Sequence, residues 1–141
     1  MGFFTDEFLS KIAKTLYDDS TLQGLGVNVQ LGPLRSGAYT NPCIMVSFDA
    51  DSKDYIGVDI DSVVVRVSLF TDEDSPPGQG TTFDSIYARA NALLEEQRFS
   101  YSMTKGWTVL YSMSRGVPSW NPDTKEFYRT WTYEAKVADT G

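Results

Sequence analysis

The side chains most able to do chemistry in this chain are carboxylates, which gather in two polar stretches. Five aspartates lie between positions 49 and 61, and Asp72, Glu73 and Asp74 follow one another a little later. Two carboxylates held together could act as acid and base, but the spacing selects no such pair. We interpret both stretches as solvated loop and edge charge, which discourages unwanted strand pairing.

A calcium loop is the metal site that the first stretch resembles. Starting from Asp49, an EF-hand would need an oxygen ligand at its fifth position, glycine at its sixth and glutamate at its twelfth. The chain has Lys53, Asp54 and Ile60 there. The pattern fails, so we expect no metal and no cofactor.

The histidine and cysteine content excludes several kinds of catalytic and metal-binding site. There is no histidine, which excludes Ser-His-Asp and Cys-His mechanisms and imidazole ligation of a metal. The one cysteine, Cys43, opens the apolar run 43–46 and is predicted to be a small core residue. We therefore predict no catalytic residues and no enzymatic activity, and a reducing, cytoplasmic setting.

Charge and aromatic content bear on the partners. A net charge of −7 argues against nucleic-acid binding, which depends on clustered lysine and arginine. The aromatics could form a stacking platform for sugars, or they could pack on a half-buried sheet or in a subunit interface, which is the more common use. They are Tyr101, Trp107, Tyr111, Trp120, Trp131 and Tyr133.

A protein interface is the site that these residues favour. Arg35 and Arg115 stand beside glycines in predicted loops, where they either reach carboxylates of a partner or are ordinary surface residues. The candidate interface residues are Arg35, Arg115, Asp72, Glu73, Asp74 and Trp120.

No segment is predicted to target or cross a membrane. The N-terminal residues lack a basic region and a long apolar core, and no apolar run approaches the ~18 residues of a membrane span. A length of 141 residues fits one domain over 1–141.

Hydrophobic periodicity predicts two helices. Thr5 could cap the first, whose apolar residues recur at spacings of three and four from Phe8 to Tyr17, and whose end is expected near Asp18-Asp19. The second is expected over 82–97, with one buried side. That side comprises Phe83, Ile86, Tyr87, Ala90, Leu93 and Leu94.

Strands are predicted between and after the helices. They cover 27–30, 43–48, 62–70, 107–113 and 127–137, with proline- and glycine-rich loops at 31–42 and 72–80. In the last strand every second residue is turned to one side, and Asn121-Pro-Asp-Thr supplies the turn before it. The order α-β-β-β-α-β-β predicts an α+β fold: a mainly antiparallel sheet with two helices packed on one face.

This order of elements resembles the tail-terminator, or tail-completion, proteins of long-tailed bacteriophages. The likeness extends over almost the whole chain. It rests on the helix exit Leu-Tyr-Asp-Asp-Ser-Thr-Leu (16–22), the Gly-Pro loop (32–33), the strand entry Asn-Pro-Cys-Ile-Met-Val-Ser (41–47), the acidic β-branched strand (59–70), the helix Ile-Tyr-Ala-Arg-Ala-Asn-Ala-Leu-Leu (86–94) and the turn Asn-Pro-Asp-Thr-Lys-Glu-Phe-Tyr-Arg (121–129).

The resemblance implies a virion protein, made in the host cytoplasm and placed at the head-proximal end of the tail. Its subunits would form a ring, expected to be hexameric, which caps the tail tube, ends its polymerisation and offers a joining surface to the head-completion or connector protein. DNA would pass through the lumen without specific binding, because acidic residues there would repel phosphates.

Two other readings stay open on the sequence. One is another structural role in a virion, such as a neck connector or a baseplate component. The other is a monomeric ligand-binding module or small hydrolase that uses the acidic loops and the aromatics. A ring that does not cap tubes would favour the first, and a stable monomer with a ligand-dependent melting shift would favour the second.

Overall fold

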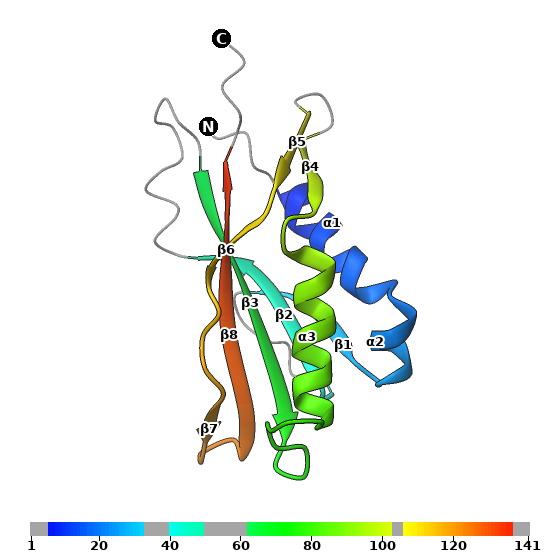
Figure 1. The fold of residues 1–141 in the computed structure, drawn as a ribbon, viewed down its shortest axis with the longest axis vertical. Helices are drawn as coiled ribbons and strands as arrows, with labels where there is room; N and C mark the ends of the chain where they lie inside the picture. Colours follow the sequence, from blue (N-terminus) through cyan, green and yellow to red (C-terminus); the bar gives the residue numbers. More distant parts are fainter. Residues whose placement is uncertain (1–5, 33–39, 50–61, 103–105, 137–141) are drawn as a thin grey trace.

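A six-stranded sheet with its helices on one face forms the framework (Figure 1). The computed structural model describes residues 6–32, 40–49, 62–102 and 106–136. The elements are α1 (Asp6–Tyr17), α2 (Ser20–Gly24), β1 (Asn28–Leu31), β2 (Cys43–Phe48), β3 (Ser62–Asp72), α3 (Thr82–Leu94), β4 (Arg98–Ser102), β5 (Gly106–Val109), β6 (Tyr111–Ser114), β7 (Ser119–Asn121) and β8 (Glu126–Lys136). The predicted α+β class is confirmed.

The sheet has the order β1-β2-β3-β8-β6, and β7 pairs with the other half of β8. Its centre is the antiparallel pair of β3 and β8, which are in register from Ser62 opposite Lys136 to Asp72 opposite Glu126. Every pairing is antiparallel except that of β1 with β2. The strand predicted over 127–137 is therefore a central strand of the sheet.

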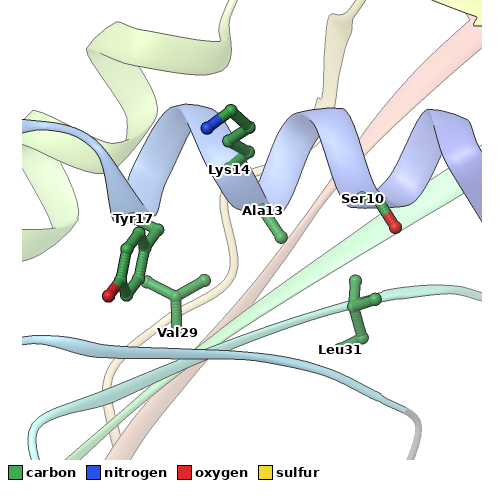
Figure 2. A pocket seen from close by; sticks show the side chains of 6 residues that line it. All are labelled: Ser10, Ala13, Lys14, Tyr17, Val29 and Leu31. Atoms are coloured by element: carbon green, nitrogen blue, oxygen red, sulfur yellow. The ribbon is translucent and has the colours of Figure 1, made fainter.

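Helix α1 lies across the helical face of the sheet near β1. Its apolar stripe of Phe8, Leu9, Ile12 and Leu16 is buried, as predicted. Tyr17, predicted to belong to the same stripe, is instead 62% exposed at the C-terminal end of α1. Figure 2 shows Tyr17 leaning toward Val29 of β1, with Ala13 and Leu31 further along the same groove.

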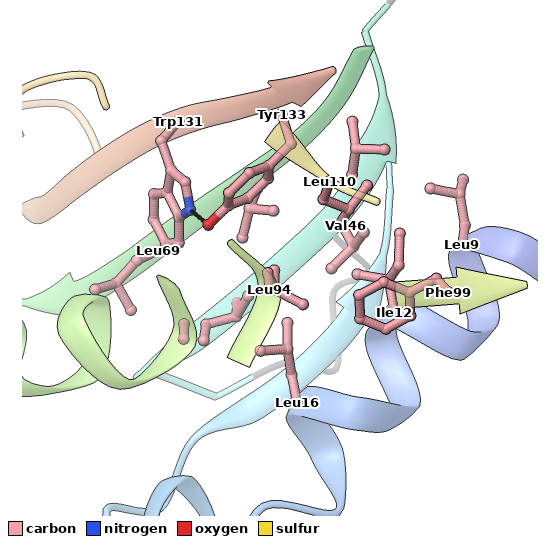
Figure 3. Close-up of a cluster of buried hydrophobic side chains, with 14 of the residues drawn as sticks. Leu9, Ile12, Leu16, Val46, Leu69, Leu94, Phe99, Leu110, Trp131 and Tyr133 are labelled. Carbon is pink, nitrogen blue, oxygen red and sulfur yellow. Dashed lines mark hydrogen bonds between the residues drawn. The ribbon is translucent and has the colours of Figure 1, made fainter. Parts of the chain in front are cut away.

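Helix α3 is joined to β8 by a buried polar network, of which Figure 3 shows the hydrogen bond between Trp131 and Tyr133. The indole Nε1 of Trp131 donates to the Tyr133 hydroxyl at 2.8 Å, and this hydroxyl donates to Oδ1 of Asn91 on α3 at 2.5 Å. Burial raises the pKa of Tyr133 well above its ordinary value. The Trp131 indole N–H and the Tyr133 hydroxyl are thereby both hydrogen-bonded, and the network fixes α3 over the middle of β8.

The core lies between the helices and the sheet. Helix α3 starts at the cap Thr81, whose Oγ1 accepts from the Asp84 amide at 3.3 Å. Its fully buried side chains are Phe83, Ile86, Ala90 and Leu94. Cys43 is fully buried on β2, which confirms it as a core residue. None of the helices in the described ranges is long and apolar enough to cross a membrane.

The predicted order of elements was too simple in four places. The short elements α2, β4 and β7 were missed, and the predicted strand 107–113 is two strands, β5 and β6, in different sheets. Leu110 separates them: its amide donates to the Gln97 carbonyl, its carbonyl accepts from Glu96, and its side chain is fully buried. A buried residue bonded to another segment prevents one continuous strand.

The same contact ends α3 at Leu94 and not at the predicted Gln97. Glu95 already has an extended backbone, and Glu96 has a φ of 59°. The amide of Glu96 bonds to the carbonyl of Leu110, so it is taken out of the helix ladder. The end of the helix is therefore decided by a partner fourteen residues downstream, and sequence periodicity carries no signal for it.

Candidate protein interface

Strands β6 and β7 form one outer edge of the sheet. β6 pairs with the second half of β8 and β7 with the first, so that residues 111–121, which we call the β6–β7 edge, follow β8 along its length. All four residues of β6 are exposed. In the described part of the chain no further strand pairs with the outer side of this edge.

The segment between β6 and β7 is held tightly against β8. Gly116 has a φ of 62°, and a Cβ there would lie 1.9 Å from the carbonyl oxygen of Thr130. Arg129 of β8 donates from Nε to the carbonyl of Arg115 at 2.9 Å, and its guanidinium lies 3.6 Å from the centre of the Tyr87 ring. Arg129 thus connects this edge to α3.

Apolar side chains accumulate on the β6–β7 edge. Tyr111 and Met113 are 56% and 59% exposed, and Val117 is 72% exposed. Trp120 is 41% exposed and packs against Phe127 with ring centroids 4.6 Å apart. Large apolar groups that gather at one exposed edge are typical of a protein–protein contact.

An acidic corner, made of Asp72, Glu73 and Asp74, lies where β3 ends. It borders an open depression of about 380 Å³, with Thr124 and Lys125 on the other side. One amide, Nδ2 of Asn41, donates to Asp72 at 2.9 Å and to the buried carboxylate of Glu126 at 2.7 Å. The corner is therefore built on two paired strands and one loop amide.

The two groups of candidates meet through β8. Glu126 lies opposite Asp72 on one side and opposite Asn121 of β7 on the other, so the acidic corner adjoins the end of the β6–β7 edge. Trp120 and Arg115 both belong to that edge. Arg35, by contrast, lies outside the described residues, as do the aspartates between positions 51 and 61.

Arg115 is already partly engaged within the chain. Its Nη2 lies 3.2 Å from Oε1 of Glu95, and its side chain remains 63% exposed. An exposed pair of this kind contributes little to stability, on the order of 0–1 kcal/mol, so a partner's carboxylate could compete for the guanidinium.

No grouping of three or more His, Cys, Asp or Glu side chains suited to a metal ion occurs in the ranges described. The stretch compared with a calcium loop falls almost wholly outside those ranges, since only Asp49 is described. That carboxylate accepts from Arg66 at 3.1 Å.

Met113 and Val117 were missed as interface candidates. A signal was available: residues 106–121 hold a single charged residue, Arg115, in a chain in which 22% of residues are charged. The sequence did not reveal that this stretch lies at the edge of the sheet. That position depends on the pairing of β6 and β7 with the side of β8 that β3 does not occupy.

No protein-family model matches the chain, and no curated protein sequence matches it. Among solved structures, the chain is similar to one from the "virion of native gene transfer agent (GTA) particle", with a TM-score of 0.57 and 21% identity. The alignment covers 89% of this chain and 90% of the other. At this identity the likeness shows a shared fold.

Proposed function

We propose that this chain is a structural protein of a phage-like virion and acts as a tail terminator. The observation that carries the proposal is the likeness in fold, over about nine-tenths of both chains, to a chain of a gene transfer agent virion. The resemblance of its sequence motifs to tail-completion proteins supports the same role. We assign it no catalytic activity and no cofactor.

In this role the subunits form a ring, six-fold by the family resemblance, at the head-proximal end of the tail tube. One side of the ring contacts the tail tube protein and the other the head-completion or connector protein. A ring needs two different contact surfaces on each subunit, and the exposed apolar β6–β7 edge is suited to be one of them. The lumen admits DNA without binding it specifically, as the net charge of −7 favours.

The experiment is to measure the solution mass by light scattering and then to image the protein, alone and mixed with tail tubes, by negative-stain microscopy. We expect closed rings, found at one end of the tubes, and tubes that stop growing when the protein is added during assembly. Tubes that keep growing past bound protein would refute the terminator role.

A different position in the virion is the second candidate, because the likeness is to a chain of a whole virion particle and does not indicate a position within it. Rings that form in solution, leave tube ends bare and bind isolated connectors or baseplates would favour this candidate over a terminator.

A further inference from the structure

The sheet has two outer edges, and the strands β1 and β6 themselves lack the usual protection, although the segment from β6 to β7 carries Arg115 and Pro118. β1, Asn-Val-Gln-Leu, and β6, Tyr-Ser-Met-Ser, contain no charged residue and no proline. Soluble proteins commonly place lysine or proline on edge strands, because an exposed edge pairs readily with another chain. Figure 1 shows these two edges on opposite sides of the molecule. Within the part of the chain that the structure describes, β1 and β6 are thus open to strand pairing.

The edge at β1 carries an apolar groove. Figure 2 shows Ala13 and Tyr17 of α1 facing Val29 and Leu31 of β1 across it. The groove measures about 270 Å³ and is completed by Ser10 and Lys14. Leu31 is 45% exposed, so apolar surface is left uncovered here as on the β6–β7 edge.

The backbone of β1 also favours docking at this edge. The amides of Asn28 and Gly32 donate to carbonyls of the β2 side, at 2.8 Å and 2.7 Å. Strand alternation then turns the N–H and C=O groups of Val29 and Leu31 away from β2. In the described ranges no strand receives them. A strand laid beside β1 would find main-chain partners and a groove for its side chains.

Charge favours the opposite edge of another copy as the occupant, and strand direction is compatible with it. β1 is parallel to β2, and each step from β2 through β3 and β8 to β6 is antiparallel, so β6 runs opposite to β1. Residues 6–31 hold four carboxylates against two lysines, and one of these carboxylates, Asp19, is also paired with Arg89 of α3. Residues 106–121 hold one charged residue, Arg115, whose exposed guanidinium has only a surface pair with Glu95. Joining unlike edges therefore pairs antiparallel strands and brings Arg115 toward the acidic segment around α1, whereas two β1 edges would bring two acidic segments together.

We infer that the β6–β7 edge of one subunit docks on the α1–β1 groove of a second copy, continuing the sheet from subunit to subunit. Such a head-to-tail contact uses two different surfaces, so it closes into a ring when the rotation between subunits allows. The assignment rests on the proposed ring and names its interface: main-chain pairing between β6 and β1, with Tyr111 and Met113 at the junction and Leu31 beneath it.

The test uses two single variants, Met113→Lys on one edge and Leu31→Lys in the groove, with Ala88→Lys on the exposed side of α3 as the matched control. Both test sites are exposed, and circular dichroism and urea unfolding check that the monomers stay folded. Sedimentation velocity over a concentration series measures association. Each lysine is expected to weaken it about tenfold to hundredfold, as the loss of one buried apolar side chain implies, and the control is expected to leave it unchanged.

Mixing the two variants decides between unlike and like edges. The intact groove of Met113→Lys fits the intact edge of Leu31→Lys, so a 1:1 mixture is expected to give dimers and nothing larger. If Leu31→Lys alone dimerises, or the mixture stays monomeric, the head-to-tail assignment is wrong although rings exist. Variants that assemble like the wild type refute the interface and leave the proposed function standing. A wild type that is monomeric with and without tail tubes overturns both, whereas rings that ignore tubes refute only the terminator role.

Discussion

Replacing Gly116 by alanine should destabilise the protein far more than the same change at another glycine with positive φ. Gly116 has a φ of 62° and Gly26 a φ of 74°, so both replacements force alanine into the left-handed region. Around Gly26 no atom lies within 4 Å of the new Cβ, whereas at Gly116 the Cβ would lie 1.9 Å from the backbone oxygen of Thr130. Gly26→Ala is therefore the control for backbone strain alone.

The magnitudes follow from these surroundings. Left-handed alanine costs roughly 1–2 kcal/mol, partly offset by the lower entropy of its unfolded chain, so Gly26→Ala should lose about 1 kcal/mol. At Gly116 the loop must also move off β8, because the opposing atom is backbone. That movement breaks the bond from Arg129 Nε to the Arg115 carbonyl, and a hydrogen bond from a charged donor is worth roughly 1.5–3 kcal/mol. Gly116→Ala should therefore lose about 3 kcal/mol.

Urea unfolding of the wild type and both variants, at one protein concentration, measures the loss of free energy of unfolding. The expected shift in melting temperature is about 3–4 °C per kcal/mol for a chain of this length. Equal losses for Gly116→Ala and Gly26→Ala would refute the close approach of the β6–β7 edge to β8, and with it the placement of that edge. A change in the denaturant slope would show instead that the compactness of a state had changed.

Two further predictions concern polar groups. Tyr133→Phe leaves the Trp131 indole N–H without its acceptor and should lower the free energy of unfolding by about 2 kcal/mol. Tyr87→Phe should be neutral or slightly stabilising, because the Tyr87 hydroxyl is buried with no partner among the described residues. Equal effects of the two variants in thermal melts would contradict this. The hydrogen bond from Arg89 lowers the pKa of Asp19 below 3.8, so this pair stabilises the fold above about pH 4 and the contribution is lost as the pH falls further. Asp19→Asn keeps the helix cap; it should lower the free energy of unfolding by about 1 kcal/mol at pH 7 and make it depend less on pH below about pH 4. Asp19→Ala also loses the cap and should lower the free energy of unfolding by about 2 kcal/mol. If stability falls with acid in these variants as steeply as in the wild type, the role of the pair is refuted.

Strong periodicity was a reliable guide to the long elements of this fold. The alternation over 127–137 predicted β8 to within a residue at each end, and the three- and four-residue spacing predicted the buried stripe of α1. Such patterns report which side of an element is buried, and burial of one side is what fixes these elements in place. Short elements such as α2 and β7 carry too few residues to show a period.

The candidate interface was predictable in part. Trp120 and Arg115, both predicted as interface candidates, lie on the β6–β7 edge as exposed residues. The low charge of residues 106–121 was a signal for Met113 as well, but it did not show that the three residues share an edge. Their common edge exists because β8 accepts β3 on one side and both β6 and β7 on the other. Pairing of this kind is non-local and leaves no local pattern in the chain.

Residue types and periods of two and 3.6 residues were sufficient to predict the class of fold, the long helices and strands and the burial of Cys43, and to exclude histidine chemistry. Only the tertiary structure decided where α3 ends, why residues 107–113 divide at Leu110, and which strands remain as open edges. Those outcomes depend on hydrogen bonds between segments far apart in the chain, whose free energy exists only once the whole sheet has assembled.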